Sequence, residues 1–141
     1  MSTESVETDI GSDTADSLVS ATRTSLGDTL RSVVYFTPSG FDLLYVRQDL
    51  YSSEDAARKA KAQLVDLERV GFAEEPVRTA LAHRETGSDI GQYEFTVRFH
   101  ENGFVVRVIQ DDAGVLFTAD SMDVSAFEEA ISAIRGVLRG A

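Results

Sequence analysis

The strongest constraint on the fold comes from residues 93–110, in which two halves carry the sequence pattern of β-strands around a turn. In residues 93–100, apolar and polar side chains alternate without a break. The apolar set is Tyr93, Phe95, Val97 and Phe99, and the polar set is Glu94, Thr96, Arg98 and His100. A period of two over this length predicts a strand with one buried and one exposed face. Residues 104–110 are mostly apolar, so we predict a β-hairpin.

The sequence Asn102-Gly103 favours a two-residue turn between the two strands, because both positions of such a turn need a positive φ. This turn sets Val97 opposite Val108, so that both strands bury the same face. The alternative is a three-residue loop with a bulge at Gly103, which would set Val97 opposite Arg107. We prefer the two-residue turn, since a slip of one residue moves every side chain to the other face.

The preferred register places Arg98 directly opposite Arg107 on the exposed face, with His100 two residues along the same strand. Like charges opposite each other repel, and such a cluster in an acidic chain could bind an anion or the carboxylates of a partner. The alternative is that each arginine forms an ordinary surface ion pair with a nearby acid. We name Arg98, His100 and Arg107 as candidate partner-binding residues.

The charge of the chain is strongly negative. Its 24 acidic residues outnumber 13 lysines and arginines, for a net charge of −11, and Lys59 and Lys61 are the only lysines. An acidic, lysine-poor surface is typical of proteins from a salt-rich cytoplasm, where salt screens the self-repulsion. We therefore expect a halophilic source and a cytoplasmic location; an acidic protein from an ordinary cytoplasm is the alternative. The charge argues against nucleic acid as a partner, and we find no apolar run long enough for a membrane span.

The remaining elements follow from apolar periodicity and capping residues. The 141 residues fit one domain. We expect a disordered acidic tail over residues 1–14 and a single α+β domain over residues 15–141, with its first helix starting near Asp16. Ser52 or Ser53 and Asp123 are predicted helix N-caps. The buried stripe of the second helix is predicted to comprise Ala57, Ala60, Leu64, Leu67 and Val70.

The predicted order of elements is α-β-β-α-β-β-β-α. The strands are joined by tight turns, which predicts a five-stranded, largely antiparallel sheet with three main helices. Residues 71–91 form a long connection with a short helix opening near Pro76 and ending near Ala82. This connection could carry function, could be an insertion, or could cover an edge of the sheet.

This order resembles the roadblock and longin-like group, and more broadly the profilin-like folds, over about residues 16–140. The chain is also similar to an uncharacterised family of small acidic domains from halophilic archaea. The roadblock resemblance implies the strand order 2-1-5-4-3, with residues 33–36 central and residues 93–100 at an edge. Roadblock-like domains dimerise through the edge strand and second helix and act as platforms for small GTPases or motors. The matching surfaces here are residues 93–100 and 57–70.

Sequence motifs of known chemistry are absent from the chain. There is no cysteine, which excludes disulfides and thiolate catalysis. No HExxH sequence, nucleophile elbow, phosphate-binding loop or dinucleotide fingerprint occurs. His83 and His100 are the only histidines, too few for a recognisable zinc site. We therefore expect no enzymatic activity, no metal and no cofactor.

Two functions remain as hypotheses. The first is a non-enzymatic interaction or regulatory module that forms a homodimer through its edge strand and binds an unidentified protein. An exposed edge strand without proline or lysine invites pairing with another strand. The alternative is a sensor domain that binds a small molecule between sheet and helices, in a pocket lined by Tyr35, Tyr45 and Phe117.

Overall fold

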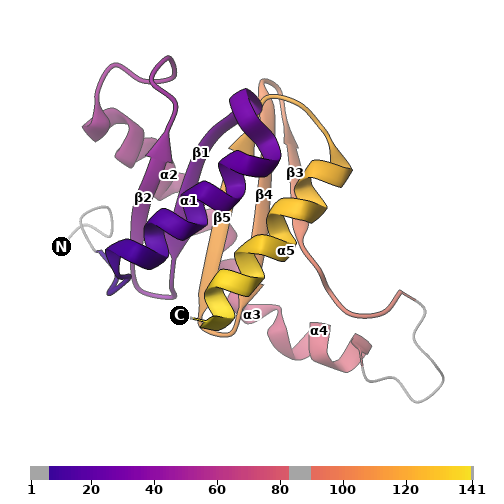
Figure 1. Cartoon of the computed structure of the whole chain (residues 1–141). Coiled ribbons are helices and arrows are strands. Elements are labelled where there is room, and N and C mark those ends of the chain that lie inside the picture. The colour runs from indigo at the N-terminus through magenta and orange to yellow at the C-terminus, as the bar shows by residue number, and fades with distance from the viewer. Residues whose placement is uncertain (1–6, 83–89, 141) are drawn as a thin grey trace.

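The computed structural model describes residues 7–82 and 90–140, and it confirms the predicted α+β class (Figure 1). The elements are α1 (Ser12–Leu26), the 3-10 turn η2 (Gly27–Thr29), β1 (Leu30–Phe36), β2 (Phe41–Val46), α2 (Glu54–Glu68), α3 (Val70–Ala73), α4 (Glu75–Ala82), β3 (Thr96–His100), β4 (Gly103–Gln110), β5 (Ala113–Ala119) and α5 (Val124–Gly140). The predicted order of main elements is present. The long connection contributes both α3 and α4, and α4 spans the short helix predicted from the sequence.

The five strands form one sheet in the order β2-β1-β5-β4-β3, and every neighbouring pair is antiparallel. This is the predicted strand order, with β1 in the interior and β3 at an edge. The strand β1 is apolar on both faces because successive side chains enter opposite layers. Val33 belongs to the hydrophobic cluster on one face and Val34 to the cluster on the other, and both are fully buried.

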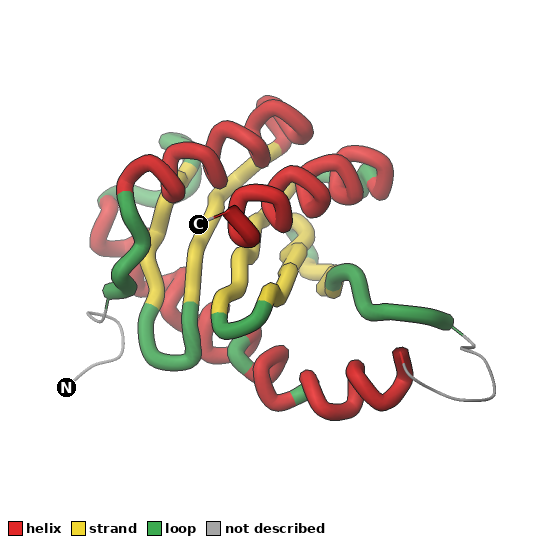
Figure 2. The backbone as a smooth tube through the Cα atoms, turned by 60° about the horizontal axis from the view of Figure 1, so that its bottom comes forward, coloured by secondary structure: helices red, strands yellow, loops and turns green. Residues whose placement is uncertain are grey.

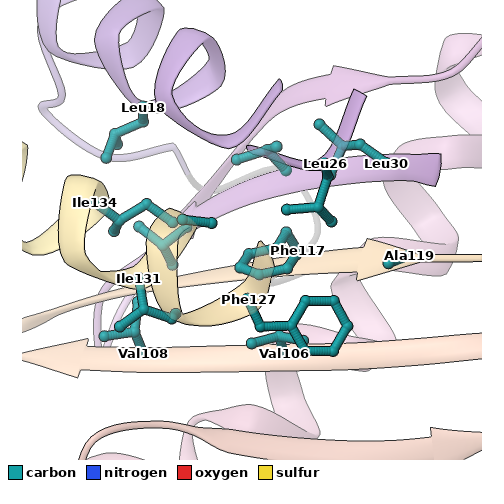
Figure 3. Close-up of a cluster of buried hydrophobic side chains, with 13 residues drawn as sticks. Leu18, Leu26, Leu30, Val106, Val108, Phe117, Ala119, Phe127, Ile131 and Ile134 are labelled. Carbon is teal, nitrogen blue, oxygen red and sulfur yellow. The ribbon is translucent and has the colours of Figure 1, made fainter. Parts of the chain in front are cut away.

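Helices cover both faces of the sheet. Helices α1 and α5 lie side by side on one face, and α2 crosses the other (Figures 1 and 2). Under α1 and α5, Leu18, Phe117, Phe127 and Ile134 fill the larger core (Figure 3). The rings of Phe117 and Phe127 meet edge to face with centroids 5.7 Å apart. The smaller core, under α2, includes Phe36, Val65 and Leu116.

Both predicted N-caps are present, whereas the predicted start of the first helix is wrong. The side chain of Ser53 accepts a hydrogen bond from the Ala56 amide, and Asp123 Oδ1 accepts one from the Ala126 amide. The first helix starts at Ser12 rather than near Asp16, and Ile10 packs against the core. The ordered domain therefore begins before residue 15, because Ile10 supplies apolar area that the acidic composition of this segment obscured. Residues 1–6 lie outside the described residues.

The register of the β3–β4 hairpin differs from the prediction by two residues. His100 lies opposite Gly103 and Val97 opposite Val106, so Glu101 and Asn102 form the turn. A shift of two keeps every side chain on its predicted face. Gly103 is the first residue of β4, and a Cβ atom there would lie 2.8 Å from the carbonyl oxygen of Ala119 in β5. The glycine therefore permits close approach of a strand and does not shape the turn.

The corrected register separates the two arginines of the hairpin. Arg98 lies opposite Val105, and Arg107 lies opposite Thr96. The predicted repulsion between directly opposed arginines is therefore wrong. The face that carries them is not exposed either, because the C-terminal half of α2 and the start of α3 cover it.

Candidate functional site

A buried ion-pair network occupies the sheet face that was predicted to be exposed. The side chains of Arg107, in β4, and Glu68, at the end of α2, are 1% and 0% exposed. Arg107 Nη1 lies 3.4 Å from Glu68 Oε1. Its Nη2 donates to Glu74 Oε1 at 2.9 Å, to Thr96 Oγ1 at 2.9 Å and to the Tyr93 hydroxyl at 3.2 Å. One guanidinium thus joins α2, the α3–α4 junction and the start of β3.

The second oxygen of Glu68 is held by Arg98 of the edge strand. Arg98 Nε lies 2.7 Å from Glu68 Oε2, and the Arg98 side chain is 33% exposed. Burial disfavours the charged form of Arg107, yet hydrogen bonds with Tyr93 and Glu74 outweigh it and raise the pKa of Arg107. Arg107 therefore keeps its charge, and the network ties β3 and β4 to the helices that cover them.

These contacts correct the candidate partner-binding set. Arg107 is enclosed by its own chain, so the prediction that it lies on the surface is wrong. Arg98 keeps part of its surface accessible, and His100 is exposed beside the hairpin turn. The structure brings Arg98 and Arg107 together only through Glu68, the residue they share.

The sequence contained a signal for this network. Buried positions of α2 are Ala57, Lys61, Ala62, Val65 and Glu68, whereas the predicted stripe was Ala57, Ala60, Leu64, Leu67 and Val70. Charged residues at Lys61 and Glu68 continue the spacing of Ala57 and Val65 along one helical face. A charge in register with a buried stripe indicates an internal partner, which Glu68 has in Arg98 and Arg107. The helix is rotated so that part of its second apolar stripe, including Leu67, remains exposed.

Gly71 of α3 packs directly on this network. A Cβ atom at this position would lie 2.8 Å from Cζ of Arg107, which cannot withdraw without breaking its ion pairs. We expect Gly71→Ala to lower the free energy of unfolding by about 1–3 kcal/mol, the usual cost of overpacking. Gly136→Ala is the matched control: it lies in helix α5 with open space around it, and we expect a gain of about 0.5–1 kcal/mol. Urea unfolding of both variants measures the difference; equal effects would contradict the close packing.

The outer side of β3 forms the second feature of this region. Within the sheet β3 pairs only with β4. Helix α3 packs on the face of the sheet, against Arg107 and Phe36, and α4 lies below β3 in Figure 1 rather than alongside it. The described part of residues 71–91 therefore does not cover this edge. We use the term edge surface for the strand residues Arg98, Phe99 and His100 together with the helical residues Leu67 and Val70.

The edge surface is unusually apolar for an acidic chain. Phe99 is 70% exposed, and Leu67 and Val70 are each 46% exposed. Leu67 and Val70 are close in the chain to Glu68, which contacts Arg98 of β3, so they lie near the edge strand on the α2 face, whereas Phe99 points to the opposite face of the sheet. Large apolar side chains left in solvent near an unpaired strand are typical of an interaction surface.

The three residues of the predicted sensor pocket do not surround one cavity. Tyr35 lines a surface hollow of about 560 Å³ beside Thr8 and Asp111. Tyr45 lines another, of about 310 Å³. Phe117 is fully buried in the core against Phe127. Helices α1 and α5 fill the space between them, and so the predicted pocket is not formed by these residues.

The described residues contain no group of three or more histidine, aspartate or glutamate side chains placed to hold a metal ion. His83 lies outside these residues. None of the helices described is long and apolar enough to cross a membrane.

The sheet order, with α1 and α5 on one face and α2 on the other, defines a roadblock-like fold, and comparison with solved structures agrees. The gliding protein MglB from Thermus thermophilus matches with a TM-score of 0.52 and 14% sequence identity, over 97% of this chain and 98% of that one. A structure described as MglB with tetrameric arrangement matches with a TM-score of 0.51 and 14% identity, over 96% of each chain. These likenesses concern the fold.

Sequence comparison identifies the family. Residues 16–139 match the family described as "Domain of unknown function (DUF7522)", and the chain belongs to it. A search of curated proteins finds no match.

Proposed function

We propose that this chain is a non-enzymatic interaction module that forms a homodimer through the edge surface. The observation that carries the proposal is the unpaired outer side of β3 next to exposed Phe99, Leu67 and Val70. An open edge presents a row of unpaired backbone donors and acceptors. A two-fold pairing of β3 with the same strand of a second copy would satisfy these groups and bury the apolar side chains.

The composition of the edge surface favours contact with a second copy of the chain. Neither proline nor lysine occurs in residues 93–100, so the usual devices that protect an edge are missing there. The second apolar stripe of α2 is left partly uncovered, which is explained if another copy packs on it. The fold likeness is consistent with this proposal, since one similar structure is described as a tetrameric arrangement.

The charge of the chain sets the conditions under which a dimer would form. Two copies that each carry a net charge of −11 repel each other in dilute buffer. At about 1 M salt the screening length falls to roughly 3 Å, which removes most of this repulsion. We infer that the protein works in the cytoplasm of a halophile. A further protein partner would use Arg98 and His100, whose side chains reach the surface beside the shared edge.

Spin labels test the arrangement of the dimer, because the chain has no native cysteine. A single label at Glu101→Cys lies three residues beyond Arg98, so an antiparallel pair centred on Arg98 separates the two labelled backbones by about 20 Å. We expect pulsed electron resonance to show a distance in this range. The matched label at Ser20→Cys, on α1, would lie more than about 30 Å from its copy, given the spacing between strands. A long distance for Glu101→Cys with a short one for Ser20→Cys would contradict pairing at β3.

A further inference from the structure

Lys61 lies in the middle of α2. Its side chain belongs to the buried stripe, and the residue is 3% exposed. In the described part of the chain it has no ion pair and no hydrogen bond; its one recognised contact is with the ring of Tyr51, 5.4 Å from Nζ to the centroid. Lys59, the other lysine, is exposed and pairs with Asp55 at 3.3 Å.

Among the described residues, the fully buried side-chain nitrogens without a partner are Arg69 Nη2 and Arg107 Nε, so the Lys61 ammonium still reaches water. Burial of the rest of its side chain nevertheless reduces its hydration, and no opposite charge compensates for this. Burial and the nearby charge of Arg31 lower the pKa of Lys61 to about 8. The group is still mainly protonated at neutral pH. An acidic chain with 24 carboxylates has thus left its most buried lysine unpaired, although Glu68 and Asp120 close by are each paired with two arginines.

Lys61 lines a hollow of about 320 Å³ between α2 and the ends of β1, β4 and β5. Arg31 and His100 line the same hollow and add positive or protonatable groups. Asp120 binds Nη1 of Arg31 at 2.9 Å, and within the described residues Nε and Nη2 of Arg31 have no hydrogen-bond partner. Glu101 is the one acid among the lining residues; it lies exposed on the hairpin turn and forms no ion pair with Lys61.

The rest of the lining is apolar or hydroxylic. Leu64 and Val105, which belong to the core under α2, form apolar walls, and the Thr118 hydroxyl is held by Ser32 at 2.6 Å. Cationic groups at one place and apolar walls beside them fit a ligand with a charged head and a small hydrocarbon body. A fully hydrated inorganic anion would leave the apolar walls unused.

We propose that this hollow binds a small organic carboxylate, whose carboxyl group pairs with Lys61 and Arg31 while its hydrocarbon part packs against Leu64 and Val105. The site lies on the α2 face of the sheet. It shares His100 with the edge surface, whereas Lys61 and Arg31, which pair with the carboxylate, lie outside that surface. It gives the chain a means of responding to a metabolite, in addition to its role as an interaction module.

The two lysines make a direct test possible. With ¹³Cε-labelled lysine the protein gives two signals, and Lys59 is an internal control. We expect benzoate, titrated at fixed KCl concentration, to shift the Lys61 signal saturably and to raise its pKa from about 8, and to leave Lys59 unchanged. Benzyl alcohol, the neutral analogue, and inorganic phosphate should each bind at least tenfold more weakly. Equal shifts at both lysines, no shift at Lys61, or equal affinity for benzyl alcohol would overturn the proposal.

Three variants distinguish ligand binding at Lys61 from a loss of folding and from pairing of Lys61 with Glu101. Lys61→Met should lower benzoate affinity at least tenfold, measured from the ligand signals, whereas Lys59→Met should leave it unchanged. Unaltered affinity in Lys61→Met would overturn the proposal; if that variant does not fold, the titration of the unaltered chain decides alone. Glu101→Gln tests whether the carboxylate of Glu101, in the hairpin turn, pairs with the Lys61 ammonium. A further fall in the pKa of Lys61 would identify Glu101 as its partner in solution and would also overturn the proposal.

Discussion

Arg107→Met is expected to lower the free energy of unfolding by about 3–5 kcal/mol, the largest loss we expect from any single substitution. Methionine preserves much of the volume but removes the guanidinium that serves Glu68, Glu74 and Thr96 together. Glu68, which is fully buried, would keep only Arg98. A buried carboxylate that loses a partner must either bear the loss of hydration or take up a proton, and both options destabilise the folded chain.

Urea unfolding in concentrated KCl measures this loss, because urea adds no ionic strength. Arg139→Met is the control: it makes the same chemical change at an exposed position near the end of α5, where we expect a change within about 0.5 kcal/mol. A loss below about 1 kcal/mol for Arg107→Met, comparable with an ordinary surface ion pair, would show that the network does not hold α2 to the sheet.

Phe99→Lys and Leu67→Asp are expected to disrupt the dimer. Each substituted residue occurs twice in a two-fold interface, and burying a leucine or phenylalanine contributes about 1.5–3 kcal/mol. Lysine at position 99 also supplies the edge protection that β3 lacks. We expect each variant to raise the dissociation constant at least about tenfold, and the pair together about a hundredfold, since about 1.4 kcal/mol corresponds to a factor of ten.

Both positions are exposed in the single chain, at 70% for Phe99 and 46% for Leu67, so the fold should survive. Light scattering over a range of protein concentrations gives the dissociation constants. Ser20→Lys is the control, because it adds the same charge on an exposed position of α1, the helix that packs on β1 and β2. A dimer that persists unchanged in the double variant would assign the interface to another surface.

The predictable part of the fold was the part with local signals. The alternation of residues 93–100 and the capping residues Ser53 and Asp123 act within one element, and the structure confirms the hairpin and both caps. The strand order followed from the roadblock resemblance, in agreement with the apolar character of β1 on both faces. Such features depend on the period of a strand or helix and not on the rest of the molecule.

The features that were predicted wrongly depend on residues that are far apart in the sequence. The observed hairpin register leaves Gly103 within β4, close to Ala119 of β5, and no turn preference reports this contact. The burial of Arg107 depends on Glu68, 39 residues away. In both cases a tertiary contact prevailed over a sound local preference. Charged residues in register with the buried stripe of α2 were the one sequence signal for the second contact.

The mass of the unaltered chain in several molar KCl shows directly whether two copies join through the edge surface. The chain has a mass of 15.4 kDa. We expect light scattering to give twice this value at micromolar concentration, with a fall to the single-chain mass on dilution or in the variant Phe99→Lys/Leu67→Asp. A mass of one chain at every concentration would contradict the account, since the exposed apolar residues beside β3 would then have no second copy to cover them.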